Sequence, residues 1–220
     1  IDTGIDYTNP IFREASGNSR IRAIWDQTIQ TGKPPEGFLY GTEYSREEID
    51  RALQSDDPFD IVPSRDENGH GSAMASVAVG SATREFLGAA PDADIVVVKL
   101  KECKQYLRDF YLLPDNVPAY QENDIMLAVQ YADSFAEQFN RPVVICLGLG
   151  TNSGDHEGNS TLGEFLETIA EKPSRAVVVC GGNEGNAAHH YAGQLGNGTA
   201  ESERIGDLGI PETMREPVEI

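Results

Sequence analysis

Cysteine and long apolar runs are scarce in this sequence. The 220 residues contain three cysteines, Cys103, Cys146 and Cys180, which are far apart and form no Cys-x-x-Cys pair. This spacing argues against a disulfide framework or a zinc knuckle. Cys146 and Cys180 lie in apolar runs, which predicts buried and unreactive thiols. No apolar run approaches the roughly 20 residues needed to cross a bilayer, so we expect no membrane span.

Positive charge is scarce as well. Lysine and arginine total 17 against 36 aspartates and glutamates, which gives a formal net charge of -19 at pH 7. A polyanion would be repelled, so we expect neither nucleic acid nor an anionic membrane surface as a partner. The excess of carboxylates would suit a secreted enzyme and offers oxygen ligands to calcium. No Asp-x-Asp-x-Asp-Gly loop marks a calcium site, however.

Runs of β-branched apolar residues alternate with helical patterns along the chain. Their continuous apolar character is typical of strands buried on both faces of a parallel sheet, and we expect such strands over 94–100, 142–147 and 176–180. Periodic apolar positions predict helices over 122–139 and 161–171, the latter capped by Ser160 or Thr161. Small residues predict a buried helix over 70–81. This alternation indicates an α/β fold with right-handed crossovers.

Three regions depart from this alternation. Residues 13–66 are rich in turns and contain a short helical stretch near 45–54, so we interpret them as a surface insertion. Residues 193–220 are also turn-rich and end in a candidate edge strand at 217–220. Ile1 and Asp2 are interpreted as the last residues of a strand whose earlier part is missing.

Three glycine-rich motifs carry residues suited to hydrolysis: Asp2-Thr3-Gly4, Asn68-Gly69-His70-Gly71-Ser72 and Gly181-Gly182-Asn183-Glu184-Gly185. The Asp2 carboxylate could orient a histidine, bind a metal or cap its own turn. His70 could accept and return a proton near neutral pH. The Asn183 amide follows an apolar strand and could donate to a developing oxyanion, or could simply occupy a left-handed turn.

Two other patterns indicate cofactors only weakly. Gly148-x-Gly150-x-x-Ser153 lacks the amphipathic helix that follows a dinucleotide-binding loop. His189-His190 and Asp155-His156-Glu157 fit solvated loops better than metal ligands, because no His-Glu-x-x-His frame is present. We therefore expect no metal site among these residues and no required cofactor.

Taken in order, the motifs resemble those of the subtilisin-like serine proteases, the subtilases. The stretch Gly88–Asp94 resembles the Gly-Val-Ala-Pro segment of that family, and Gly148-Leu149-Gly150 resembles its Ser-Leu-Gly segment. The resemblance covers nearly the whole chain except 13–66, 101–121 and the tail. Ile24-Trp25-Asp26-Gln27 and the stretch Asn186–His190 look closest to clostridial members, including the Csp-type subtilases of spore germination.

The resemblance implies a fold and a set of roles. The fold would be a three-layer subtilisin-like α/β domain with a mostly parallel sheet, incomplete at both ends, with residues 1–220 as part of the catalytic domain. Asp2 would orient His70, His70 would be the general base, and Asn183 would stabilise the oxyanion. A protein or peptide substrate would pair with Gly148, Leu149 and Gly150, and its side chain would enter a pocket walled by Cys180, Gly181 and Gly182. Structural calcium and an extracellular or cell- or spore-associated location would be typical of the family.

One motif of the family has no counterpart here. The nucleophile motif Gly-Thr-Ser is absent, and the nearest string is Gly198-Thr199-Ala200. We interpret the chain as a piece of a serine endopeptidase that is inactive alone, and the alternative is an inert pseudoprotease that binds or signals, for example in spore germination. A truncated domain would also expose apolar faces through which two copies could form a non-native dimer.

Overall fold

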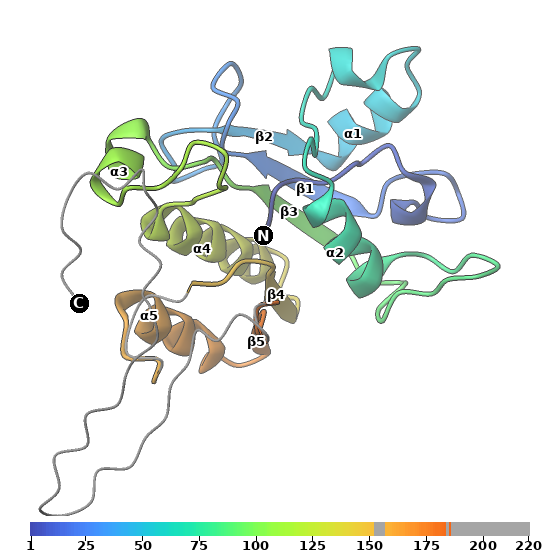
Figure 1. Cartoon of the computed structure of the whole chain (residues 1–220). Coiled ribbons are helices and arrows are strands. Elements are labelled where there is room, and N and C mark those ends of the chain that lie inside the picture. The colour runs from blue at the N-terminus through green and yellow to red at the C-terminus, as the bar shows by residue number, and fades with distance from the viewer. Residues whose placement is uncertain (152–156, 184, 186–220) are drawn as a thin grey trace, which may run out of the picture. The chain divides into compact units, whose positions relative to one another are not determined.

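The computed structural model of the protein describes residues 1–151, 157–183 and 185 (Figure 1). These residues form two compact units. The first comprises Ile1–Cys103 and Pro118–Gly181, and the second comprises Lys104–Val117 and the described residues from Gly182 onward. The second unit contains α3 (Gln105–Phe110). The edge strand expected at 217–220 and the stretch Asn186–His190 lie outside the described residues.

The first unit is built on two groups of strands. The strands are β1 (Ile21–Asp26), β2 (Thr42–Ser45), β3 (Ile95–Lys99), β4 (Val143–Leu147) and β5 (Arg175–Val179). They pair in the orders β2-β1-β3 and β4-β5, and β2 is the one antiparallel strand among them. The expected mostly parallel α/β architecture is therefore present.

The first two residues of the chain connect these two groups. Asp2 pairs in parallel with Lys99 at the end of β3, through hydrogen bonds from its own N–H to the Val98 carbonyl and from the Leu100 N–H to its carbonyl. On the other side, the nitrogen of Ile1 donates to the Cys146 carbonyl at 3.0 Å, and the Gly148 N–H donates to the Ile1 carbonyl at 3.3 Å. Ile1 and Asp2 thus form a two-residue strand between β3 and β4, as the sequence predicts.

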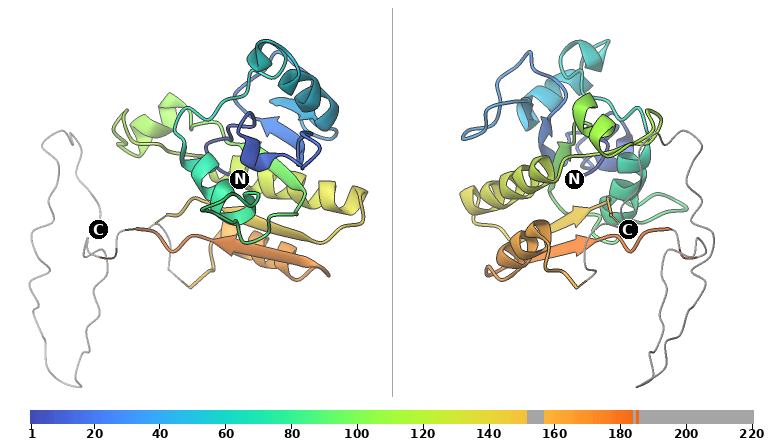
Figure 2. Two further views of the ribbon diagram at one scale, coloured as in Figure 1. Left: turned by 90° about the vertical axis from the view of Figure 1, so that its right-hand side faces the viewer. Right: turned by 60° about the vertical axis from the view of Figure 1, so that its left-hand side comes forward.

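Helices cover both faces of the β1–β3 group. They are α1 (Arg46–Leu53), α2 (His70–Val79) and α4 (Glu122–Gln138), with short 3-10 turns at Pro10–Phe12 and Pro58–Asp60. The helix α5 (Thr161–Ala170) instead packs, together with α4, on β4 and β5. One core cluster joins Ile24 and Val97 to α1 and α2. A second, on the opposite face, joins Trp25 and Val98 to α4. This gives the three layers expected, and Figure 2 shows α2 and α4 on different sides of these strands.

Local sequence accounts for where the helices begin. Ser45 caps α1 in a capping box, in which its hydroxyl accepts from the Glu48 N–H and Glu48 returns a bond to the Ser45 N–H. The Ser160 hydroxyl accepts from the Gly163 N–H and caps α5. Both helices therefore start where their capping residues predict. No helix among the described residues is long and apolar enough to cross a membrane.

The interpretation of residues 13–66 as a surface insertion is wrong for β1. This strand lies between β2 and β3, and its Ile24 and Trp25 side chains are fully buried. The ring of Trp25 lies 4.7 Å from that of Phe38 and 5.3 Å from that of Tyr131 on α4, measured between centroids. The stretch after β1 is therefore anchored to the core by aromatic packing, which could not be predicted from its turn-rich composition.

Two surfaces expected to be buried are exposed in the described structure. One face of β4 and β5 packs on α4 and α5, but Val144, Cys146 and Val178 on these strands are solvent-exposed. The prediction of a buried Cys146 thiol is therefore wrong. In α2 only Gly71 is fully buried. Ala75 and Val79 are partly buried against the core, and Met74 and Val77 are exposed to solvent. A continuous apolar run shows that a strand is internal, but not how many of its faces are covered.

Candidate active site

His70 and Asp2 are hydrogen-bonded to each other. His70 is the first residue of α2 and follows Gly69, whose φ of 82° turns the chain into the helix. Its Nδ1 lies 2.8 Å from Asp2 Oδ1. The Asp2 side chain is 10% exposed, whereas that of His70 is 43% exposed. The carboxylate is thus shielded while the imidazole remains accessible, which is the arrangement that an orienting acid and a general base require.

The pair lies where the parallel strands end. Asp2 ends the two-residue strand, and Leu100, Gly148 and Cys180 each follow directly after β3, β4 and β5. Active sites of α/β proteins gather at this carboxyl edge, because the loops that leave the strands converge there. Backbone pairing therefore brings residues from distant parts of the sequence to one place.

Gly148 packs directly against the pair. A Cβ on this residue would lie 1.8 Å from Asp2 Oδ2 and 3.4 Å from His70 Cε1. Asp2 Oδ2 is buried and has no hydrogen-bond partner within the described part of the chain. A side chain at position 148 would displace the carboxylate, so glycine is the residue that this contact permits.

Sequence reasoning missed Asp66, which ties the two motifs together. Its carboxylate accepts hydrogen bonds from the Thr3 hydroxyl at 2.8 Å and from the N–H of Ser72 at 2.8 Å. It also accepts from the Ser72 hydroxyl and the Gly69 N–H. An aspartate shortly before a helix that starts on glycine is a capping signal, and that signal could have identified it.

Lys99 and Glu67 form an ion pair beside Asp2, which pairs with Lys99 through the backbone. Lys99 Nζ lies 2.8 Å from Glu67 Oε2 and also donates to the Arg65 carbonyl at 2.7 Å. The hydrogen bond from Lys99 holds the pKa of Glu67 below its ordinary value. Lys99 and Glu67 line a hollow of about 310 Å³, together with Thr3, Asn68 and Tyr120. A cleft with charged walls therefore adjoins the Asp2–His70 pair.

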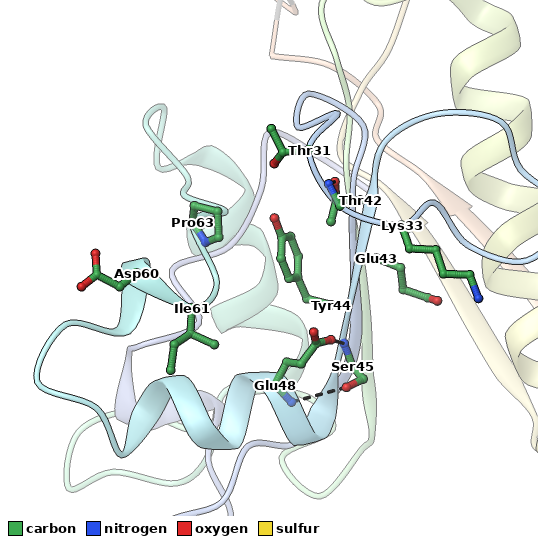
Figure 3. A pocket seen from close by; sticks show the side chains of 11 residues that line it. Thr31, Lys33, Thr42, Glu43, Tyr44, Ser45, Glu48, Asp60, Ile61 and Pro63 are labelled. Atoms are coloured by element: carbon green, nitrogen blue, oxygen red, sulfur yellow. Dashed lines mark hydrogen bonds between the residues drawn. The ribbon is translucent and has the colours of Figure 1, made fainter.

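A larger hollow, of about 480 Å³, lies between β2 and the segment 60–63 (Figure 3). Two of the carboxylates that line it are already engaged. Glu48 accepts from the Ser45 N–H in the capping box, and Glu43 accepts from the Tyr131 hydroxyl at 2.6 Å. None of the residues that line it is one of the predicted catalytic residues, so its size alone does not make it the candidate site.

The remaining predicted site residues divide between the two units. Leu149 is half-buried against the Trp25 cluster, and a Cβ on Gly150 would lie 3.4 Å from the Cys180 sulfur, so these two loops are adjacent. Gly181 ends the first unit. Gly182, with a φ of 77°, and the exposed Asn183 belong to the second unit. In the described residues no group of three or more His, Cys, Asp or Glu side chains could hold a metal ion.

Comparison with known proteins identifies a family and similar solved structures. The sequence profile of the subtilase family, peptidase S8, matches residues 1–203. The structure is similar to that of the CspB protease of Clostridium perfringens, with 32% sequence identity and a TM-score of 0.72, over 86% of this chain and 36% of that one. A psychrophilic protease, S41, matches at 21% identity and a TM-score of 0.48, over 81% of this chain and 43% of that one. No curated protein matches the chain.

This chain spans 36% of the length of CspB. The family profile nevertheless covers both residues of the hydrogen-bonded pair and nearly the whole of the described structure. On the strength of that match, the chain belongs to the subtilase family.

Proposed function

We propose that this chain carries the acid–base half of the active site of a serine endopeptidase. The single observation that supports this most strongly is the 2.8 Å hydrogen bond between Asp2 and His70, with the imidazole open to solvent. Nothing in the packing of the core requires a histidine at that position. The membership of the family gives the reaction class, the hydrolysis of peptide bonds.

His70 is the proposed general base. Asp2 accepts from Nδ1–H, which leaves Nε2 free to remove the proton from a serine hydroxyl as that oxygen attacks the peptide carbonyl. The imidazolium formed in this step is stabilised by the adjacent carboxylate. It then protonates the leaving amine, and the cycle repeats with water.

The substrate is proposed to be an extended polypeptide. Gly148, Leu149 and Gly150 leave the carboxyl end of β4 beside the catalytic pair, and small residues there allow a second backbone to approach closely. Cys180, Gly181 and Gly182 are proposed as the wall of the pocket for the substrate side chain, and Asn183 as the oxyanion donor. In subtilisin, a member of the same family, loss of the equivalent donor lowers kcat by about 10²–10³-fold. Members of the family are commonly secreted, and we propose an extracellular or cell-associated location.

The nucleophile is proposed to come from outside these 220 residues, since they contain no Gly-Thr-Ser motif. The alternative is a subtilase without catalytic activity that binds or signals. An inert site would have no chemical need for a buried carboxylate aligned on an accessible imidazole, so the geometry favours the enzyme.

A fluorophosphonate probe that reacts only with activated serines distinguishes these functions. We expect the 220-residue chain to remain unlabelled and the full product of its gene to be labelled at one serine. In that full protein, Asp2→Asn should lower kcat for a peptide substrate by about 10⁴-fold. The control is Leu39→Ala, because Leu39 is 95% exposed and lies in the stretch between β1 and β2.

Each outcome has a clear meaning. Labelling of the full protein that disappears in His70→Ala supports the endopeptidase. An unlabelled full protein that still folds would refute it in favour of the inert subtilase. Labelling of any serine within the 220 residues would refute the proposal that the nucleophile lies elsewhere.

A further inference from the structure

α2 begins without a capping side chain of its own. Its N-cap residue, Gly69, has no side chain, so the N–H groups of the first turn bind side chains from elsewhere: His70 donates to Asn68 Oδ1, and Gly71 donates to Thr3 Oγ1. The carboxylate of Asp66 lies at this end of the helix and accepts the Gly69 N–H at 3.0 Å and the Ser72 N–H at 2.8 Å. A negative charge at a helix N-terminus is also favoured by the helix dipole.

Both oxygens of Asp66 are fully used. Oδ1 accepts from the Thr3 hydroxyl at 2.8 Å in addition to Gly69, and Oδ2 accepts from the Ser72 hydroxyl at 2.7 Å in addition to the Ser72 N–H. The Ser72 oxygen in turn accepts from the Asp6 N–H at 2.8 Å. One carboxylate therefore joins α2 to the chain on both sides of Gly4.

These bonds complete a closed circuit that contains the catalytic pair. Thr3 Oγ1 donates to Asp66 and accepts from the Gly71 N–H at 3.0 Å. The Thr3 N–H donates to Asp2 Oδ1 at 2.7 Å, and the same oxygen is bound by His70. Thr3, which follows Asp2, is hydrogen-bonded to Asp66. Gly69, which precedes His70, is also hydrogen-bonded to Asp66, and Gly71, which follows His70, is bonded to the Thr3 hydroxyl.

We propose that Asp66 is a positioning residue for the active site, whose carboxylate sets the distance and orientation of His70 relative to Asp2. This inference rests on the proposed function for its significance, since the pair matters only if His70 acts as a base. Asp66 itself need not touch a substrate. An amide in its place would keep only one acceptor oxygen, so some of the four donors would lose their acceptor.

Asp66→Asn is the variant that tests this. An amide keeps one acceptor oxygen, and its NH2 group must face two donors whichever way it is turned. The direct readout is NMR of the His70 ring nitrogens in the 220-residue chain, which contains four histidines. His70→Gln identifies the His70 signals by their loss.

We expect wild-type His70, when neutral, to carry its proton on Nδ1 and to give a downfield Nδ1–H signal. In Asp66→Asn that signal should be lost, and the proton should be shared between the two ring nitrogens. An unchanged His70 spectrum in a folded Asp66→Asn protein would overturn the proposal.

Asp133→Asn is the matched control. Asp133 is also buried and fully engaged, with Arg175 Nε at 2.6 Å and Lys172 as its partners, but it joins α4 to β5 and to the residues just before that strand. Its loss should lower stability without moving the His70 signals. Loss of the Nδ1–H signal in both variants would mean general loosening and would also overturn the proposal.

A second pair of variants covers the case in which Asp66→Asn does not fold. Ser72→Ala removes one donor to Asp66 and should weaken the Nδ1–H signal, and Ser72→Thr, which keeps the hydroxyl, should restore it. Equal spectra for the two would count against Asp66. None of these measurements needs turnover, so a full protein without hydrolytic activity would refute the proposed function and leave this test valid.

Discussion

Gly71 lies against the carbonyl oxygen of Gly4 so closely that a Cβ on it would be 2.1 Å away. This contact presses the first turn of α2 onto the turn that follows Asp2. It is formed by backbone on both sides, so neither partner can rotate aside. The distance between the Asp2 turn and α2 is therefore set by main-chain packing as well as by the hydrogen bonds of Asp66.

Gly71→Ala should accordingly displace α2 from the Asp2 turn. We expect a loss of about 1–3 kcal/mol in the free energy of unfolding, the usual cost of forcing extra volume into a packed site. Urea denaturation followed by circular dichroism measures it. Gly185→Ala is the control, because a Cβ there would meet no atom within 4 Å and its stability should not change. Equal stability of the two variants would contradict the prediction.

The charge of Asp66 should make stability depend on pH in the acid range. Burial opposes its ionisation, but the hydrogen bonds from Ser72, Thr3 and Gly69 outweigh burial and hold the pKa of Asp66 below its ordinary value of 3.8. A group whose pKa is lowered on folding contributes stability above its unfolded pKa and loses it as the pH falls through its folded pKa.

The stability difference between wild type and Asp66→Asn should therefore be constant above about pH 5 and shrink below pH 3.8. Chemical denaturation at a series of pH values provides the measurement. A difference that grows as the pH falls would have the wrong sign and would contradict this account of the Asp66 charge.

Asp26 supplies a third test, in the segment that the sequence pattern misplaced. Its carboxylate is fully buried at the end of β1 and accepts from the Ser64 hydroxyl at 2.6 Å and the Thr28 N–H at 2.8 Å. Ser64→Ala removes one donor from a buried acceptor and should cost about 1–3 kcal/mol. A double-mutant cycle with Asp26→Asn measures the coupling energy between Asp26 and Ser64. A coupling energy near zero would contradict a stabilising hydrogen bond between them.

The exposed face of β4 and β5 should cause self-association. Val144 is 64% exposed and Val178 is 52% exposed, and an apolar patch of this kind favours burial against a second copy. Light scattering of the 220-residue chain should give a mass above 23.9 kDa that rises with concentration. Replacing both valines by threonine, which has the same shape, should lower the measured mass toward that of the monomer. Leu39→Ser is the control, and a clean wild-type monomer would refute this prediction.

The sequence singled out Asp2 and His70 because their signals are local, and the structure places the two side chains in hydrogen-bond contact. His70 and Asp2 each sit in a short glycine-rich motif, and the strands that carry their neighbours are continuous apolar runs. Helix starts at Ser45 and Ser160 were equally local, since a capping serine acts within one turn.

Features that depend on distant packing were not predictable in the same way. β1 is short and surrounded by turns, and its place in the sheet depends on Trp25 packing against α4, more than 100 residues later. The exposure of Cys146 depends on whether another element covers the outer face of β4, which a run of apolar residues cannot encode. The capping of α2 by Asp66 is local, but its hydrogen bond to Thr3 joins residues 63 positions apart, which a sequence pattern does not show.

The two-residue strand Ile1–Asp2 has a consequence for how the protein acquires its site. The nitrogen of Ile1 bonds to a residue 145 positions away, and Asp2 pairs with the end of β3. Closing loops of this length costs entropy that only a nearly complete sheet can offset. We therefore expect the hydrogen bond between Asp2 and His70 to form only once β3 and β4 are in place. A partly folded chain would hold the His70 imidazole without the Asp2 carboxylate beside it.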